Sequence, residues 1–383
     1  MVRFFLVNFD FLSYTLLIIE FWIEVILMSE SNVFVPKVFY KYPSIENTYR
    51  TELIDKINGL HYDKLRYCVT EKIHGANTQI DYNFKTGKFV IGKRTDVLKD
   101  GEDFYHSLSV LESFQDKISD IAMFLQSHLA TDEAPLAVIR VYGELFGGSY
   151  PHSAVPVNKS ANRVQKGVFY SPDNEWAAFD ISYSFDAEIT GDDGVYFMNG
   201  RDFRSVCERF ALPVVPLLAV TDNLSDALVY PNDGLSEVYS MFGLPPLEHN
   251  VMEGVVIRPW DVDVWMGMTR LVLKNKNQKF AEKKQERKSV PDSVELSDSV
   301  QHAFSEISAY ITENRVQNVL SHYGDFTEKD IGKLIGLCCQ DALADYRKDF
   351  KTLDFMDKSE EKLVTKQLTR LMAPVVRKVV LGY

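Results

Sequence analysis

Metal-binding cysteine pairs, long uninterrupted hydrophobic runs and an excess of positive charge are all missing from this chain of 383 residues. Its four cysteines show no metal-ligand spacing, and the two adjacent ones cannot readily bridge each other without strain. We therefore expect reduced thiols that pack in the core of a cytoplasmic protein. The formal net charge of −12 argues against nonspecific coating of nucleic acid, because Lys and Arg normally supply that affinity.

The first 27 residues form an unusual prefix, rich in aromatic and aliphatic side chains but interrupted by Asp10, Glu20 and Glu24. A membrane span needs about 20 predominantly apolar residues, and these carboxylates would lie inside it. No small-residue cleavage site follows, which argues against a signal peptide. We expect that translation begins at Met28 and that the prefix is a misassigned start; a membrane tether is the alternative.

The rest of the chain is long enough, and at 46% hydrophobic content apolar enough, for one large core and a smaller one. Strand-like alternations separated by Gly, Asn and Asp turns run from Phe39 to about residue 284. Helical spacing predicts helices at about 103–129 and 201–210. No βαβ alternation, G-x-G-x-x-G or Walker loop occurs, so the pattern indicates an α+β domain of antiparallel sheets and argues against a Rossmann or P-loop enzyme.

Residues 287–293, RKSVPDS, carry the breakers of a linker, and helical periodicity follows them. A last helix is predicted over Glu360–Met372, ending before Pro374. We therefore divide the chain into an N-terminal extension (1–38), a catalytic domain (39–288) and a helical C-terminal domain (289–383).

One lysine stands out in the segment EKIHGAN at 71–77, where an alternating strand gives way to a turn. Lys72 is followed three residues later by Gly75, which sets a primary amine beside flexible backbone. A protonated amine is a poor nucleophile, so an enzyme that used it would need neighbouring positive charge or a desolvated pocket. Lys274 and Lys276 alternate with apolar residues and would project from one strand face, where they could hold a phosphate.

These lysines belong to a basic segment in an acidic chain. Residues 270–288 contain eight basic and two acidic side chains, a net charge of +6, which leaves −18 for the remainder. A solvated lysine-rich strand is one interpretation; a contact to polyphosphate or an RNA backbone is the other, and the companion motifs favour it.

Those companions follow in a fixed order: GKRTD at 92–96, VYGELFGG at 141–148, WAAFDIS at 176–182, MEGVVIRP at 252–259 and LVLKNKN at 271–277. The series resembles the motif order of the covalent nucleotidyltransferases, which include polynucleotide ligases and messenger RNA capping enzymes. His74 stands where DNA ligases typically carry aspartate. With KYPSIENTYR at 41–50 and NRVQNVLS at 314–321, the chain resembles, from Phe39 almost to its end, the RNA ligase 2 family of T-even bacteriophages and its relatives, the kinetoplastid RNA-editing ligases.

The resemblance implies a nucleotidyltransferase domain of the ATP-grasp-like ligase type, followed by a small all-α domain in place of an OB-fold. It implies an ATP-dependent RNA ligase that seals 3′-hydroxyl and 5′-phosphate ends, at nicks in duplex RNA, through a lysyl-AMP at Lys72 and an RNA-adenylate. ATP and Mg²⁺, or Mn²⁺, would be the cofactors. We expect a monomer of bacteriophage type, acting in the host cytoplasm without membrane attachment.

The resemblance also implies roles near the nucleotide. Lys274 and Lys276 would bind the α-phosphate and take part in catalysis, and Glu253 would organise the metal. Glu144 would contact the ribose and Phe179 would stack on adenine.

Further roles concern the turn after the nucleophile and the RNA. Glu71 would frame the adenine pocket, and His74 and Asn77 would lie near the phosphates. The RNA end would meet three other residues: Arg94, Asp180 and Arg258. Arg258 departs from the family, since the phage enzyme has lysine there; it keeps the charge but changes the shape.

Three alternatives stay open: a DNA ligase, a GTP-using capping enzyme and a noncatalytic protein that binds RNA ends. His74 and the helical C-terminal region disfavour the first two, and the complete set of charged positions disfavours the third. The stretch at 149–163 reads as an insertion to which the sequence assigns no function.

Overall fold

The computed structural model describes residues 39–99, 101–102, 104–105, 107–283, 288, 297–324, 326–350 and 358–382. The prefix at 1–27, the start expected at Met28 and nearly all of the linker expected at 287–293 lie outside this range. None of the described helices is long and apolar enough to cross a membrane.

The first of two five-stranded sheets contains the strands that lead into or carry the motifs at 71–77, 252–259 and 271–277. Its strands run in the order β1 (Glu46–Asn47), β12 (Leu273–Lys276), β9 (Gly254–Pro259), β2 (Tyr67–Glu71) and β8 (Leu217–Thr221). All neighbours are antiparallel except β1 and β12. One face packs against α2 (Thr51–Gly59) in a cluster around Ile57, Val69 and Ile257. The end of β2 therefore lies beside the start of β9, although these strands are about 180 residues apart in the sequence.

The second sheet follows the order β4 (Lys88–Lys93), β3 (Ala76–Asn83), β5 (Leu136–Gly147), β6 (Asn174–Phe185) and β7 (Tyr196–Phe197), with antiparallel pairing throughout. Helices α3 (Ser107–Glu112) and α4 (Gln115–Leu129) pack on it around the buried side chains of Leu111, Ile121 and Trp176. The indole of Trp176 lies where a Cβ at Gly143 would be, 2.2 Å away, so β5 accepts only glycine at this position.

Helices α3 and α4 correct the prediction of one helix over 103–129. At the break between them, the Ser113 hydroxyl donates to the Val110 carbonyl and the Phe114 ring packs on Trp176, 5.1 Å between centroids. The predicted helix at 201–210 is confirmed as α6 (Gly200–Arg209), where Asn199 caps the amide of Asp202.

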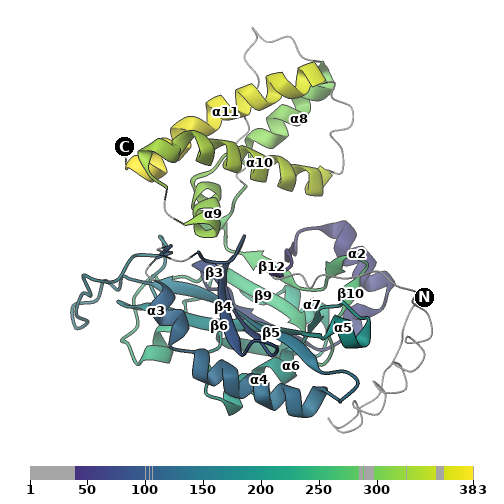
Figure 1. Cartoon of the computed structure of the whole chain (residues 1–383). Helices are drawn as coiled ribbons and strands as arrows, with labels where there is room; N and C mark the ends of the chain where they lie inside the picture. The colour runs from purple at the N-terminus through teal and green to yellow at the C-terminus, as the bar shows by residue number, and fades with distance from the viewer. Residues whose placement is uncertain are drawn as a thin grey trace.

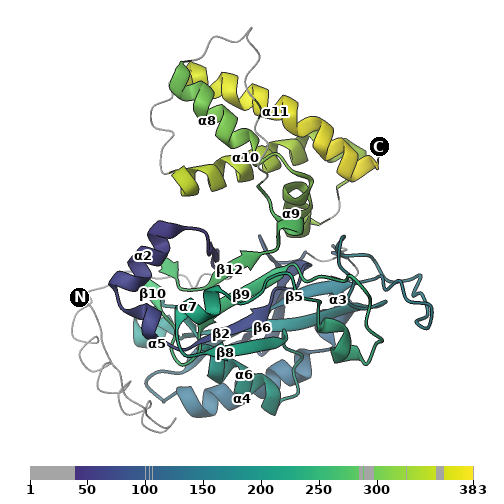
Figure 2. The ribbon, with the colours of Figure 1, turned by 180° about the vertical axis from the view of Figure 1, so that it is seen from behind.

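The C-terminal part is all-helical, with α8 (Asp298–Ser308), α9 (Glu313–Tyr323), α10 (Ile331–Phe350) and α11 (Lys358–Leu381) around one core. Figures 1 and 2 show these helices together on one side of the sheets, with α9 nearest the strands. The prediction that the last helix ends before Pro374 was wrong. The fully buried side chain of Val376 continues the apolar stripe of Leu368 and Met372, so packing holds the helix beyond the proline.

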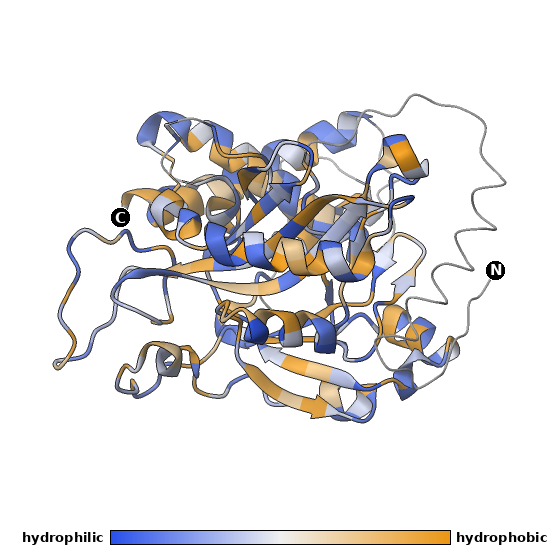
Figure 3. Ribbon diagram, turned by 60° about the horizontal axis from the view of Figure 1, so that its bottom comes forward, coloured by the Kyte–Doolittle hydropathy of each residue, from blue (hydrophilic) through white to orange (hydrophobic). Residues whose placement is uncertain are grey.

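The remaining elements are short: η2 (Tyr62–Lys64), α5 (Ala187–Thr190), α7 (Leu224–Leu228), η3 (Val238–Phe242), β10 (Trp265–Met266), β11 (Thr269–Arg270), η4 (Gln278–Phe280) and η5 (Glu328–Asp330). Most elements carry both hydrophobic and hydrophilic positions (Figure 3), as expected where each buries one face. The predicted α+β class, with antiparallel sheets followed by an all-helical part, is confirmed.

Candidate active site

A cavity of about 240 Å³ is lined by both sheets and by helices α9 and α10. Every site residue predicted from the sequence lines it except Asp180. Residues of seven of the described strands line this space (β2, β3, β5, β6, β8, β9 and β12). The ends of β2 and β12 lie beside the start of β9, and the start of β3 pairs with the C-terminal half of β5.

Lys72 leaves β2 and enters the cavity. Its backbone amide donates to the Gly254 carbonyl (2.9 Å), which extends the pairing of β2 with β9 by one residue. The chain must then turn sharply, and a Cβ at Gly75 would lie 2.1 Å from the carbonyl oxygen of Leu145. Glycine three residues after Lys72 is therefore a steric requirement of this turn.

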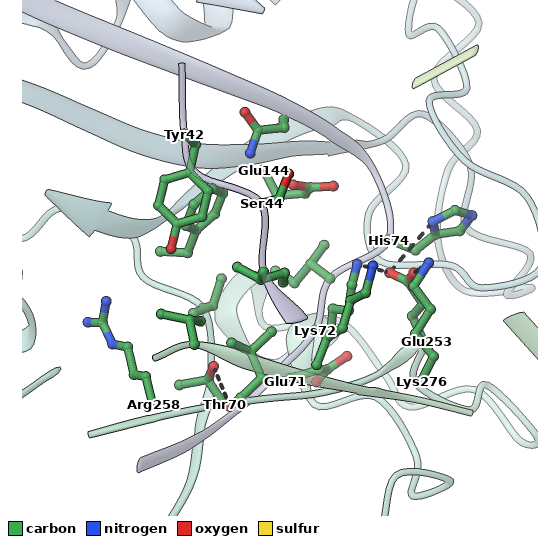
Figure 4. Close-up of a pocket in the computed structure, with 18 of the residues that line it drawn as sticks. Tyr42, Ser44, Thr70, Glu71, Lys72, His74, Glu144, Glu253, Arg258 and Lys276 are labelled. Atoms are coloured by element: carbon green, nitrogen blue, oxygen red, sulfur yellow. Dashed lines mark hydrogen bonds and ion pairs between the residues drawn. The ribbon is translucent and has the colours of Figure 1, made fainter. Parts of the chain in front are cut away.

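Glu253 is the centre of the charged groups (Figure 4). Its Oε2 lies 2.7 Å from Nζ of Lys72 and its Oε1 lies 3.0 Å from Nζ of Lys276. The ring of His74 approaches the same carboxylate, with Nδ1 3.7 Å from Oε2. Burial alone would raise the pKa of Glu253, but the two ammonium groups lower it to about 2, so the carboxylate is ionised at neutral pH.

The two lysines of β12 both line the cavity, as their alternation with apolar residues predicted. Lys276 pairs with Glu282 (2.5 Å) as well as Glu253, and these partners raise its pKa despite burial. Burial lowers the pKa of Lys274, and the neighbouring positive charge of Lys276 and Lys72 lowers it further.

Two other carboxyl groups of the cavity, the buried Glu71 and the half-buried Glu144, have raised pKa values. Burial raises the pKa of Glu71 to about 7 and that of Glu144 to about 7, the latter partly offset by Lys72. Oε2 of Glu71 accepts from the Glu237 amide (2.9 Å), while Oε1 has no hydrogen-bond partner in the described part of the chain. An unpaired buried oxygen that faces a cavity is suited to accept a hydrogen bond from a ligand.

The turn and its neighbours complete the wall. The backbone amide of His74 donates to the Tyr170 hydroxyl (2.9 Å). Burial lowers the pKa of the His74 ring to about 4, so this ring is neutral at pH 7. Asn77 on β3 is paired in register with Glu144 on β5. Arg94 donates to the Tyr42 carbonyl (2.7 Å) and also lines the cavity.

Asp180 and Arg258, which were predicted to meet an RNA end, pair with each other between the two sheets; Arg258 lines the cavity and Asp180 does not. Asp180 is fully buried, accepts from the Tyr42 hydroxyl (2.9 Å) and pairs with Arg270 (2.5 Å) and Arg258 (2.9 Å). The guanidinium of Arg258 is also held over the Phe203 ring, 4.8 Å from its centroid. Both side chains therefore join the two sheets, because a carboxylate inside an apolar run requires cationic partners.

Several residues of the cavity wall escaped sequence reasoning. Glu282 lies in the basic segment, and the others come from the helical part: Asn318, Ser321, His322, Asp341, Asp345 and Lys348. No periodicity distinguishes them from ordinary polar positions, so only their position in space reveals them.

Glu282, Asp341 and Asp345 bring carboxylate oxygens within 4.8 Å of one another. The guanidinium of the fully buried Arg315 pairs with all three, 3.0 Å from Asp345 and 3.9 Å from Glu282. The cluster is therefore already neutralised by protein cations. Glu253 is paired with two lysines as well, but the neighbouring Glu144 forms no ion pair within the described residues. Together these two carboxyl groups offer the hard oxygen ligands that Mg²⁺ or Mn²⁺ prefers.

Comparisons with known proteins agree with the predicted family. Residues 65–276 match the model for RNA ligase, and residues 294–374 match the model for the T4 RNA ligase 2 C-terminal region. Mitochondrial RNA-editing ligase 2 of Trypanosoma brucei brucei is 25% identical over 357 residues, covering 82% of this chain and 84% of that protein. Solved structures of Naegleria gruberi RNA ligase variants, one with AMP and Mn and one with ATP and Mn, align at 13% and 12% identity, each with a TM-score of 0.40. These alignments cover 64% of this chain but only 58% of the Naegleria chains.

Proposed function

Because this chain belongs to the RNA ligase family and is an RNA ligase, we propose that it seals 3′-hydroxyl and 5′-phosphate RNA ends with ATP, through a lysyl-AMP at Lys72. The observation that carries the proposal is the placement of the Lys72 amine 2.7 Å from Glu253, with Lys276 on the other oxygen of that carboxylate.

The first step is an in-line displacement. The Lys72 ammonium group must first release a proton. Its nitrogen then attacks the α-phosphorus of ATP: the nitrogen–phosphorus bond forms, the bond to pyrophosphate breaks with its electron pair leaving on that group, and a second proton leaves the nitrogen for solvent. Lys274 and Lys276 stand where they can offset negative charge on the α-phosphate oxygens. Positioning and charge neutralisation supply most of the catalysis in such reactions.

The next two steps pass the adenylate on. An oxygen of the RNA 5′-phosphate displaces Lys72 and forms RNA-adenylate; the 3′-hydroxyl of the adjoining strand then displaces AMP and forms the phosphodiester. Arg94 is suited to the 5′-phosphate because a guanidinium presents two parallel donors to phosphate oxygens. His322, on α9, lines the same cavity, so the helical part borders the space into which the RNA end would enter.

A divalent cation would be held by Glu253 with Glu144, and it would offset the negative charge of the polyphosphate. The remaining pocket suits adenine. Phe179 and Val256 supply apolar walls, and the unpaired Oε1 of Glu71 can accept from an exocyclic amino group. Guanine presents a carbonyl oxygen at the equivalent ring position, to which ionised Glu71 cannot donate, so the ionised form of Glu71 disfavours the capping-enzyme alternative.

The choice of nicked duplex RNA remains part of the proposal. Duplex RNA is recognised mainly through its shape, phosphates and 2′-hydroxyls, and the cavity is bordered by both parts of the chain. The expectations of a monomer, a bacteriophage source and the host cytoplasm also stay predictions.

A labelling experiment tests the covalent step. The full chain, its Lys72→Ala variant and a Lys64→Ala control are incubated with α-labelled ATP or GTP and Mg²⁺, then denatured. We expect acid-labile label from ATP on the wild type and the control, and at least a 100-fold loss on Lys72→Ala. Label on folded Lys72→Ala would contradict the nucleophile. Label from GTP would favour the capping alternative, and no label at all would favour the noncatalytic one.

A further inference from the structure

The stretch at 149–163 and the three residues after it form a loop that the catalytic steps above do not use. We refer to residues 149–166 as the basic loop, because they contain Lys159, Arg163 and Lys166 and no Asp or Glu. This composition is unusual in a chain with a net charge of −12. All three basic side chains are exposed.

Both ends of the basic loop are attached beside the active site. The loop leaves from β5, the strand that carries Glu144, and returns through Val168 and Tyr170. Those two side chains share a buried cluster with Ile73 and Phe280, directly behind the catalytic turn.

Contacts with the turn and with the basic segment strengthen this attachment. The Tyr170 hydroxyl accepts from the amide of His74 (2.9 Å), and the His74 ring packs edge-on against Phe280, 5.4 Å between centroids. Lys279, which follows the cavity lysines in sequence, donates to the Gly167 carbonyl (2.6 Å). Positive side chains therefore continue from β12 through Lys279 to the foot of the basic loop.

Hydrogen bonds also hold the basic loop to the end of β5 and the start of β6. The amide of Asn162 donates to Oδ1 of Asn174 (2.9 Å), and Nδ2 of Asn174 donates back to the Asn162 carbonyl (2.6 Å). Asn158 donates to Asp173 (2.6 Å), and the Gln165 side chain accepts from the Gly147 amide (3.0 Å). Gly148, at φ +81°, permits the close approach, since a Cβ there would lie 2.1 Å from the Asn162 carbonyl oxygen.

We propose that the basic loop is an RNA-binding surface, on which Lys159, Lys166 and Lys279 contact backbone phosphates of the RNA strand that enters the cavity. The proposal rests on the proposed function and extends it by adding a substrate contact outside the catalytic pocket. Phosphate contacts of this kind orient the substrate and add affinity without reading its sequence. Because the rest of the molecule is acidic and repels RNA, the negatively charged RNA is attracted mainly to this local positive surface.

Binding is measured on the full chain carrying Lys72→Ala, which cannot form the lysyl-AMP, with a fluorescent nicked RNA duplex over a series of KCl concentrations. The test variant adds Lys159→Ala and Lys166→Ala; Arg163 is kept because it bonds the Gln165 carbonyl. The control adds Lys85→Ala and Lys88→Ala instead, which removes the same charge at the far end of β3.

We expect the test variant to bind at least about 10-fold more weakly at moderate salt, with a slope of log affinity against log salt reduced by about 2. The control should keep the parent affinity. Equal affinity and slope in the test variant and its parent, or the same loss in the control, would overturn the proposal. ATP labelling of the wild-type chain is measured in parallel. Its failure would reject the proposed function, whereas normal labelling with unchanged RNA affinity would reject only the basic loop.

Discussion

Individual carboxyl groups in this cavity have very different pKa values, and the neighbours of each explain why. Glu253 lies between two ammonium groups and stays ionised. Glu71 is just as buried, yet its oxygens meet a backbone amide and no cation, so burial dominates and its pKa rises. The difference keeps Glu253 ionised beside its two cations, whereas Glu71 carries a proton in part of the molecules near neutral pH.

Glu71 should therefore make stability depend on pH. Its pKa is about 7 in the folded chain against an ordinary 4.5, so the folded state keeps a proton that the unfolded state has released. The stability that this proton supplies is fully present below pH 4.5 and is lost as pH rises to about 7. Glu71→Gln should remove this dependence and raise the free energy of unfolding at pH 8 by up to about 3 kcal/mol relative to the wild type.

Urea unfolding of wild type and Glu71→Gln at pH 5, 6, 7 and 8 measures the effect, with the exposed Glu133→Gln as control. A difference between wild type and Glu71→Gln that stays constant over this range would show that Glu71 is ionised throughout.

At the scale of elements, packing overrides local signals at two places. The chain between α3 and α4 breaks although its periodicity is helical, and α11 continues although Pro374 interrupts its backbone hydrogen bonding. In each case buried side chains on both sides of the irregularity fix the path of the chain.

Replacing Pro374 tests this account of α11. Pro374 is exposed, so alanine leaves the buried stripe intact while restoring an amide that can donate to the Arg370 carbonyl. We expect Pro374→Ala to raise the free energy of unfolding by about 1–3 kcal/mol in chemical denaturation. The exposed Lys366→Ala on the same helix should have little effect. Destabilisation by Pro374→Ala would mean that a bend at the proline is needed for packing.

On the scale of the whole molecule, the helical part is joined to the sheets by buried charge. Arg315 on α9 donates to the Tyr310 carbonyl (2.9 Å) and pairs with carboxylates of α10 and with Glu282, whose other oxygen pairs with Lys276. A second contact joins Arg50 on the sheet side to Asp349 on α10 (3.1 Å). The cavity wall is therefore complete only when both parts of the chain are in contact.

Arg315→Met should destabilise the protein strongly, because it leaves Glu282, Asp341 and Asp345 close together with much less compensating charge. The expected loss is about 3–5 kcal/mol, measured by urea unfolding at pH 7. Adding Asp341→Asn and Asp345→Asn to that variant should recover part of the loss, because it removes the unpaired charge. If Arg315→Met alone proved as stable as the wild type, buried pairing would not hold the helical part.

The sequence by itself determined the α+β class, the all-helical C-terminal region, the family and eleven of the residues that line the cavity. It could do so because the spacing of apolar residues records which face of an element is buried, and because Lys72, Glu253 and Lys276 stand in short motifs. Only the tertiary structure decided which side chains meet. The pairing of Asp180 with Arg258 and Arg270 joins positions 78 and 90 residues apart. His322 lines the same cavity as Lys72, which lies 250 residues earlier. Local periodicity carries no information on such distant partners, since electrostatic pairing depends on where the folded elements bring charges together.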